Sequence, residues 1–458
     1  MTVTEPSPTT TEDARVPLSF NQEFLTLFDQ GDEKGPFGPK YSIVYGWHVR
    51  GAVDPDTLRE AMDLVVCRHE ALRTVVVRGD EDKYQTVLPA SPTKLRVVDL
   101  PGVAPADRAA AAEDLLIDLE QSDYPVADLP LFQAVLARFD DDESVLVLIA
   151  HHTAVDGWSM HLLIRDLTAF YAVLRGHELP DLPELTQYQE YVRWERERFA
   201  HERLAPSREY WATQLEGARI LALPTDWRKS EGRPKSTAAH RFLVDEEVTA
   251  AAIELAKETR GSAFMVMLAA YEVFLSRRTG ETDILVTTLA SGRGQARFQE
   301  TVGSFFNFVP LRTDLSGATT FREVVAKVRA TCLKAYSHQV PFAQVMAGSP
   351  ELGASFAADD AAVFAFQVFQ FPYVLAGERV GDLELTEIRR RLRPQDSGPD
   401  IPDGALWTLD VDGSDMVGNL QYNTNIFRAE TIAELVTGFL AVLRETVTDP
   451  DSPLGGNR

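Results

Sequence analysis

The chain has 458 residues, of which 45% are hydrophobic and 25% charged, which is the composition of a globular protein long enough for two domains. Its formal net charge of −24 argues against nucleic acid as a partner, because neutralising phosphates requires a basic face. No apolar run approaches the ~20 residues of a membrane span. The only two cysteines, Cys67 and Cys332, lie in apolar helix-like patterns and predict buried free thiols in a cytoplasmic protein.

The first elements alternate between helices and strands. Residues 1–15, MTVTEPSPTTTEDAR, are polar and rich in proline and threonine, which predicts a disordered tail and not a signal peptide. Apolar residues at helical spacing predict a helix over 56–74, followed by the strand-like TVVVRG. An alanine-rich helix is expected over 104–121, and residues 131–152 read as a hairpin across an acidic turn. A helix then runs from Trp158 to a stop at Gly176.

The proline-punctuated segment HELPDLPEL, residues 177–185, marks the predicted boundary between two lobes. We expect an N-terminal lobe over 16–180 and a C-terminal lobe over 181–458. A long charged helix is predicted at the start of the second lobe. The further predicted elements are strands at 237–245, 283–290, 304–315, 363–371, 405–413 and 418–425, and helices at 262–278, 319–336 and 430–447. This alternation favours an α/β (α+β) fold.

An apolar strand ends unusually, on two adjacent histidines. In VLVLIAHHTAVDGWSM, residues 145–160, His151 and His152 are followed by Asp156 and Gly157. Consecutive strand residues point to opposite faces, so we expect one histidine to be structural and the other to be available for chemistry. A neutral imidazole, with an unperturbed pKa of ~6.5, is the natural general base near neutral pH. Asp156 could either orient a histidine or pair with an arginine and fix the turn.

Other interpretations of the pair are a satisfied core histidine, a metal site and an inactive relic. Adjacent strand histidines diverge, and the remaining histidines form no spaced ligand set, so we expect no metal. The chain contains no G-x-S-x-G motif, so the sequence does not support a covalent serine mechanism.

HHTAVDGWS, residues 151–159, resembles the His-His-x-x-x-Asp-Gly motif of condensation domains from nonribosomal peptide synthetases. The order of other segments strengthens the resemblance. PLSFNQEFLTLFDQ, RHEALRT, YQEYVRW, VGSFFNFVPLR and LQYNTNIFRAETI are similar to further family segments and begin at residues 17, 68, 188, 302 and 420. The match runs from about residue 16 to residue 453.

The resemblance implies two chloramphenicol-acetyltransferase-like lobes in a V shape with a central tunnel. A carrier protein would present an aminoacyl or acyl thioester on its phosphopantetheine arm, and an amine or alcohol would be the acceptor, with no bound cofactor, metal, nucleic acid or membrane. The family motif makes His152 the catalytic residue. The residues that it implies in support are His151, Asp156 with its partner Arg293, Gly157 and Arg73, and those that it implies in the substrate tunnel are Trp158, Ser159 and Asn307.

The resemblance also has departures and alternatives. SHQVPFAQ, residues 337–344, lacks the family's acidic positions, and no adenylation or carrier domain follows, so we expect a free-standing enzyme that meets its carrier protein in trans. Alternative functions are a noncatalytic carrier-binding recruitment module and a coenzyme A-dependent acyltransferase. An epimerising relative is disfavoured, since no Glu-Gly-His-Gly-Arg run occurs. EIRRRLRPQ, residues 387–395, is either a carrier-docking patch or a solvated edge strand.

Overall fold

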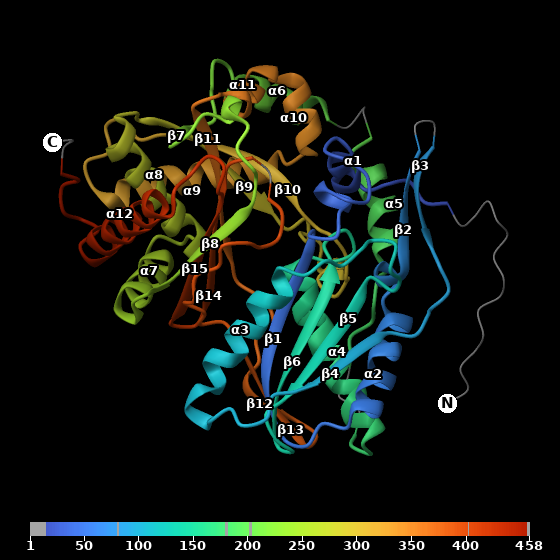
Figure 1. Cartoon of the computed structure of the whole chain (residues 1–458). Helices are drawn as coiled ribbons and strands as arrows, with labels where there is room; N and C mark the ends of the chain where they lie inside the picture. The colour runs from blue at the N-terminus through green and yellow to red at the C-terminus, as the bar shows by residue number, and fades with distance from the viewer. Residues whose placement is uncertain (1–14, 80–81, 179–181, 201–203, 402, 456–458) are drawn as a thin grey trace.

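The computed structural model describes residues 15–79, 82–178, 182–200, 204–401 and 403–455, and it divides into two halves that are each built on their own sheet (Figure 1). The predicted disordered tail lies outside the described residues except for Arg15. The mixed α/β architecture is the one that the sequence predicts.

A six-stranded, mostly antiparallel sheet forms the centre of the N-terminal half. Its strands, in spatial order, are β12 (Ala376–Val380), β13 (Leu383–Glu387), β1 (Ser42–Arg50), β6 (Glu143–His151), β5 (Phe132–Arg138) and β4 (Lys94–Asp99). The predicted hairpin over 131–152 is confirmed as β5 and β6. A separate hairpin consists of β2 (Thr74–Arg78) and β3 (Lys83–Val87).

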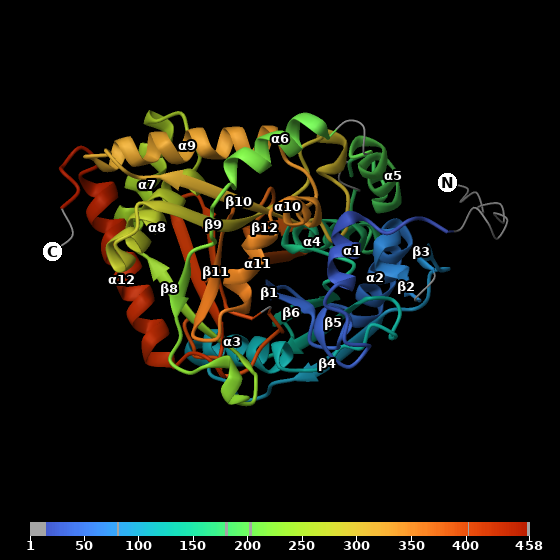
Figure 2. The same ribbon diagram turned by 90° about the horizontal axis from the view of Figure 1, so that it is seen from above.

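Helices cover both faces of this sheet because β6 is apolar from residue 145 to residue 150 and is buried along nearly its whole length. α3 (Arg108–Glu120) packs on one face, where its Leu116 belongs to the same buried cluster as Val145 and Val147 of β6. The other face is covered by α2 (Pro55–Arg68), α4 (Gly157–Leu174) and α5 (Tyr188–Arg198) (Figure 2).

The C-terminal half contains a five-stranded sheet and a two-stranded sheet. The strands of the five-stranded sheet are β7 (Ala222–Pro224), β11 (Ala361–Phe369), β14 (Ala405–Asp412), β15 (Asp415–Asn423) and β8 (Thr237–Val244), and those of the other are β9 (Asp283–Ala290) and β10 (Asn307–Asp314). The remaining helices are α1 (Phe20–Thr26), α6 (Ala205–Gln214), α7 (Glu246–Glu258), α8 (Ala263–Thr279), α9 (Phe321–Ser337), α10 (Phe342–Gly348), α11 (Gly353–Ala357) and α12 (Ala429–Thr448).

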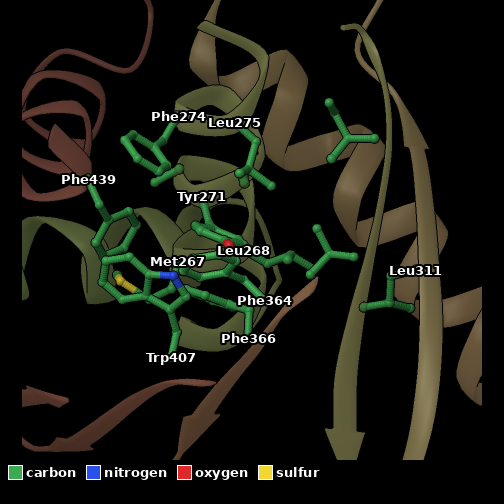
Figure 3. Packing of buried hydrophobic residues seen from close by; sticks show 14 of the residues in the cluster. Met267, Leu268, Tyr271, Phe274, Leu275, Leu311, Phe364, Phe366, Trp407 and Phe439 are labelled. Atoms are coloured by element: carbon green, nitrogen blue, oxygen red, sulfur yellow. The ribbon is translucent and has the colours of Figure 1, made fainter. Parts of the chain in front are cut away.

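α8 is the central helix of the C-terminal half and is buried on nearly all sides. Its Tyr271 stacks on Phe366 of β11, with ring centroids 4.4 Å apart, and Trp407 of β14 packs against Phe439 of α12 at 5.1 Å (Figure 3). None of the helices in the described part of the chain combines the length and the apolar character needed to cross a membrane.

The chain returns once to the N-terminal half after building most of the second sheet. β13 pairs with β1, so residues 383–387 complete a sheet whose other core strands precede residue 152. Tyr188 and Val192 of α5 also belong to the N-terminal core, although they follow the boundary predicted near residue 180. Later parts of the chain therefore complete the N-terminal half, as the orange β12 and β13 next to the blue β1 show (Figure 1).

Several sequence-based expectations need correction. The first predicted helix ends at Arg68, because His69 takes an extended conformation and its Nε2 binds the buried Asp166 at 2.8 Å. The long charged helix is interrupted: α5 ends at Arg198, and α6 begins at residue 205 with a proline in its first turn. Cys67 is exposed, whereas Cys332 is buried as expected.

The arginine-rich segment 387–395 is not a solvated edge strand. β13 ends at Glu387, and the residues after it are irregular. Arg389 forms an ion pair with Asp410 at 3.1 Å, and Arg391 forms one with Glu120 of α3 at 2.6 Å. Arg241 of β8 also reaches Glu120, at 3.0 Å. These mostly buried pairs connect the two halves.

Candidate active site

The loop between β6 and α4 lies where the two halves meet and carries the histidine pair. Ser42 of β1 faces His151, and the backbone N–H of His152 donates to the Tyr41 carbonyl at 2.8 Å, so strand pairing continues through both histidines. The loop then turns, and Asp156 caps α4 by accepting a hydrogen bond from the Ser159 N–H at 2.8 Å. The strand-to-helix turn fixes the backbone on both sides of the pair.

His151 is locked inside the N-terminal half, where it is 3% exposed. Its Nε2 lies 3.1 Å from the Gly38 carbonyl, which can only accept, so Nε2 carries the proton. Nδ1 then accepts from the Thr153 hydroxyl at 2.8 Å. Burial lowers the pKa of His151 to about 4, which keeps the ring neutral. Both ring nitrogens are occupied, so His151 braces the loop.

His152 points to the opposite face of the sheet, as strand alternation predicts. Its Nδ1 lies 2.7 Å from the Val155 carbonyl and therefore carries the proton of the neutral ring. Among the described residues, Nε2 has no hydrogen-bond partner, and its lone pair is free. Burial lowers the pKa of His152, which favours this neutral form at physiological pH.

Aromatic rings hold the His152 imidazole in place. Tyr41 stacks on it with ring centroids 4.8 Å apart and an interplanar angle of 17°. Phe306, which directly precedes β10 in the C-terminal half, approaches its edge at 6.1 Å. Tyr41 belongs to the N-terminal half, so both halves contribute to the surroundings of this histidine.

Asp156 pairs with Arg293 and does not touch a histidine ring. The Arg293 Nη2 donates to both carboxylate oxygens of Asp156, at 2.7 and 2.9 Å. Nη1 donates to the Thr301 carbonyl at 2.8 Å, and the guanidinium lies 3.8 Å from the centre of the Phe305 ring. Of the two roles open to Asp156, the geometry supports the arginine partner that fixes the turn.

The residues after Asp156 serve different purposes. Ser159, which the resemblance places in the substrate tunnel, is fully buried; its hydroxyl donates to Asp156 at 2.6 Å and accepts from the Gly303 N–H at 3.1 Å. Trp158 is half-buried, and its indole N–H donates to the Gln299 carbonyl at 2.8 Å. Gly157 lies against Phe371 and Tyr45, where a Cβ would meet atoms at 3.1 to 3.3 Å.

Two of the predicted residues, Asn307 and Arg73, bond the backbone of neighbouring elements. Asn307 connects β10 to α10: its amide donates to the Val340 carbonyl at 2.8 Å and accepts from the Phe342 N–H at 2.9 Å. A narrow cavity there is lined by Phe20, Asn21, Phe24, Phe306, Asn307, Phe308 and Phe342. Arg73 donates to the carbonyls of Val66 and Leu88, and no described hydrogen bond or ion pair joins it to the histidine loop.

Sequence reasoning missed several residues beside the loop. Tyr45 lies in β1 and Tyr41 directly precedes it, and their spacing of four residues was a usable signal, because residues i and i+4 of an extended segment share a face. His161 follows the motif directly but was read only as part of a helix. Phe371 and Glu387 arrive from the returning segment and had no local signal. In the described part of the chain, no group of three His, Cys, Asp or Glu side chains is arranged to hold a metal ion.

Comparison with known proteins identifies the family. A family model for the condensation domain matches residues 14–456. The chain is 32% identical over 445 residues to one of the linear gramicidin synthase subunits from Brevibacillus parabrevis, covering 96% of this chain and 8% of that protein. It is 29% identical over 448 residues to the phosphinothricin tripeptide synthetase PhsC of Streptomyces viridochromogenes, covering 96% and 40%. The chain thus spans less than half the length of both relatives.

Solved structures agree. The crystal structure of SgcC5 from Streptomyces globisporus, in complex with (R)-(-)-1-(2-naphthyl)-1,2-ethanediol and sucrose, is similar with a TM-score of 0.91 and 48% identity, covering 96% of this chain and 100% of that one. The first condensation domain of the calcium-dependent antibiotic synthetase, in complex with substrate analogue 3a, shares the fold at 21% identity with a TM-score of 0.76, covering 97% and 98%. These matches confirm the resemblance seen in the motifs: the chain belongs to the condensation-domain family.

Proposed function

We propose that the protein is an acyltransferase that joins an aminoacyl or acyl thioester, presented on the phosphopantetheine arm of a carrier protein, to a hydroxyl or amine of a small-molecule acceptor. The observation that carries the proposal is the free Nε2 of His152 at the junction of the two halves, in a ring whose tautomer the Val155 carbonyl fixes. The product is an ester or an amide, and the arm is released as a thiol.

In the proposed reaction, Nε2 of His152 accepts the acceptor's proton while the acceptor oxygen or nitrogen attacks the thioester carbonyl. The Nδ1–H bond to the Val155 carbonyl stabilises the imidazolium that forms. When the tetrahedral intermediate collapses, the C–S bond breaks, and the imidazolium returns the proton to the departing sulfur. General-base help of this kind contributes ~10²–10⁴-fold to the rate.

A hydroxyl depends on this help more than an amine does. An α-amine with a pKa of ~8 is partly neutral near pH 7, whereas a hydroxyl with a pKa comparable to the ~15.7 of water must lose its proton during attack. A hydroxyl acceptor is supported by SgcC5, which was solved with an aryl diol and is 48% identical to this chain. We therefore place alcohols first among the acceptors to be tested.

The other residues of the motif are proposed to position His152. His151 braces the loop from the opposite face, and the Asp156–Arg293 pair holds the start of α4. Gly157 and Trp158 border the substrates. Arg73 and Asn307 support the site without any described contact with His152. Arg73 bonds the Leu88 carbonyl after β3, and Asn307 bonds the Val340 carbonyl and so connects β10 to α10.

The test is mass-spectrometric detection of product from acyl-loaded carrier protein with a panel of alcohols and amines. The same acyl group is offered in parallel on coenzyme A, and a reaction without the protein measures background transfer. We expect a condensed product from the carrier thioester that exceeds the product from the coenzyme A thioester. Equal or greater use of coenzyme A would contradict carrier dependence. Carrier binding without product from any acceptor would favour a noncatalytic recruitment module.

A further inference from the structure

A cluster of aromatic side chains beside Gly157 takes no part in the proposed proton transfer. Phe371, in the segment that returns from β11 to the N-terminal half, stacks on His161 of α4 with ring centroids 4.2 Å apart and an interplanar angle of 21°. Tyr45 of β1 meets the edges of both rings, at 5.3 and 6.4 Å. Phe369 stacks on Phe371 at 5.2 Å. We call Tyr45, His161, Phe369 and Phe371 the aromatic wall.

A buried ion pair fixes the wall in place. His161 is fully buried, its Nδ1 donates to the Gly157 carbonyl at 2.9 Å, and its Nε2 donates to Glu387 of β13 at 3.0 Å. Burial opposes protonation of His161, but the hydrogen bond and the charge of Glu387 outweigh it and raise the pKa. The resulting imidazolium lies against the face of Phe371, an arrangement that attracts the cation to the ring. The ring of Phe371 therefore has little freedom.

Phe371 also limits the space in front of α4. A Cβ on Gly157 would lie 3.1 Å from Cε1 and Cζ of Phe371 and 3.3 Å from the Tyr45 hydroxyl. The wall is thus packed tightly against the glycine of the histidine loop. Tyr41, the ring stacked on His152, directly precedes β1, and its carbonyl accepts from the His152 N–H, so the strand pairing of β1 extends to it. Residues i and i+4 of an extended segment share a face, so Tyr45 of the wall lies on the same face of the sheet as Tyr41 and His152.

The wall offers apolar ring edges and one hydrogen-bonding group. Tyr45, Phe369 and Phe371 are half-buried, and the Tyr45 hydroxyl makes no hydrogen bond to any described residue. Three carboxylates act on the wall, and each has a cationic partner: Glu387 pairs with His161, Asp156 with Arg293 and Asp410 with Arg389. With no free carboxylate, the wall suits a neutral ligand better than the ammonium of an aminoacyl donor.

We propose that Phe371, held by the His161–Glu387 pair, determines the size of acceptor that the protein accepts, and that the acceptor is a neutral alcohol with a flat apolar ring whose polar group bonds the Tyr45 hydroxyl. The proposal rests on the proposed function, since it assigns the acceptor of the same site. The described ring contacts of Phe371 are with Tyr45, His161 and Phe369 and not with His152, so Phe371 acts on selectivity and not on the proton transfer.

The experiment compares phenyl-, naphthyl- and anthryl-1,2-ethanediol as acceptors of wild type, Phe371→Ala and a matched control, Tyr373→Ala, which removes a ring from the same segment. Affinity is measured by calorimetry and transfer by kcat/KM. Phe371→Ala should raise the anthryl-to-phenyl ratio of both quantities by about 10-fold or more, because removing a ring from a pocket wall exceeds the effect of one methylene. Tyr373→Ala should leave the ratio unchanged.

The outcomes separate this proposal from the proposed function. If Phe371→Ala shifts the anthryl-to-phenyl ratio of affinity but no diol receives an acyl group, the role of Phe371 is supported and the proposed reaction is contradicted. Transfer with an unchanged ratio overturns the role of Phe371, and failure of every diol to bind overturns the acceptor assignment. A second arm needs no substrate: Gly157→Ala should lower the melting temperature, and Phe371→Ala in the same chain should relieve part of that loss, because it removes the atoms that the new Cβ meets.

Discussion

Replacing Asp156 by Asn isolates the charge of the buried ion pair. Asn caps helices as well as Asp does, so the hydrogen bond from the Ser159 N–H can be kept while the charge is lost. Arg293 is 4% exposed and would be left with neutral acceptors, among them the carbonyls of Thr301 and Phe298 at 2.8 and 3.4 Å and the Ser159 hydroxyl at 3.0 Å. Removing one partner of a buried pair costs about 3–5 kcal/mol, because the other charge stays buried. We expect Asp156→Asn to lower the free energy of unfolding by that amount.

The assay is urea unfolding followed by tryptophan fluorescence, with Asp54→Asn as the matched control. Asp54 caps α2 through the Thr57 N–H at 2.7 Å but is exposed and has no ion-pair partner among the described residues. A surface change of this kind stays within about 0.5 kcal/mol. Equal losses in the two variants would refute the ion-pair argument. Loss of acyl transfer with unchanged stability would instead mean that Asp156 acts on His152 directly.

Three further predictions concern pH. Burial lowers the pKa of His151 from about 6.5 to about 4, so between these values the unfolded chain binds a proton at this histidine and the folded chain does not. As pH falls from about 6.5 to about 5, the free energy of unfolding of wild type should therefore decrease by about 2 kcal/mol more than that of His151→Gln. Equal decreases for the two proteins in urea unfolding would contradict this. Burial raises the pKa of Glu272, whose Oε2 has no partner, so the folded state holds a proton that the unfolded chain releases above about pH 4.3. Glu272→Gln should therefore stabilise the protein increasingly as pH rises, by up to about 1.4 kcal/mol per unit, and a constant difference in melting temperature between about pH 5 and pH 8 would argue against it. Burial lowers the pKa of His152, so kcat/KM should rise with pH and level off, with the midpoint of the rise below about pH 6.5. A higher midpoint would mean that another group causes the rise.

The spacing of apolar residues predicted the elements whose structure depends on neighbouring residues in the chain. The β5–β6 hairpin, the opposite directions of His151 and His152, and most of the C-terminal strands and helices follow from alternation and helical spacing. The condensation-domain motifs identified the family, which the family model confirms. Helix ends were less predictable, since His69 leaves the helix for a buried carboxylate that lies 97 residues away in the chain.

Contacts between distant segments could not be predicted. β12 and β13 are short and half polar, and they join the N-terminal sheet only because β13 pairs with β1 and β12 pairs with β13. Their return brings Phe371 and Glu387 next to α4, which no local pattern reveals. Ser159 illustrates the same limit: its hydroxyl bonds Asp156 and the backbone of Gly303, which lies 144 residues away in the chain, and no local pattern predicts the second contact.

The central claim is that Nε2 of His152 removes the acceptor's proton, and the single-turnover rate of His152→Ala tests it most directly. Saturating acyl-loaded carrier protein and an alcohol acceptor should give a rate ~10²–10⁴-fold below wild type, with the affinity for the carrier protein unchanged. A rate within about twofold of wild type would contradict the account, because the chemical step would then need no base at this position.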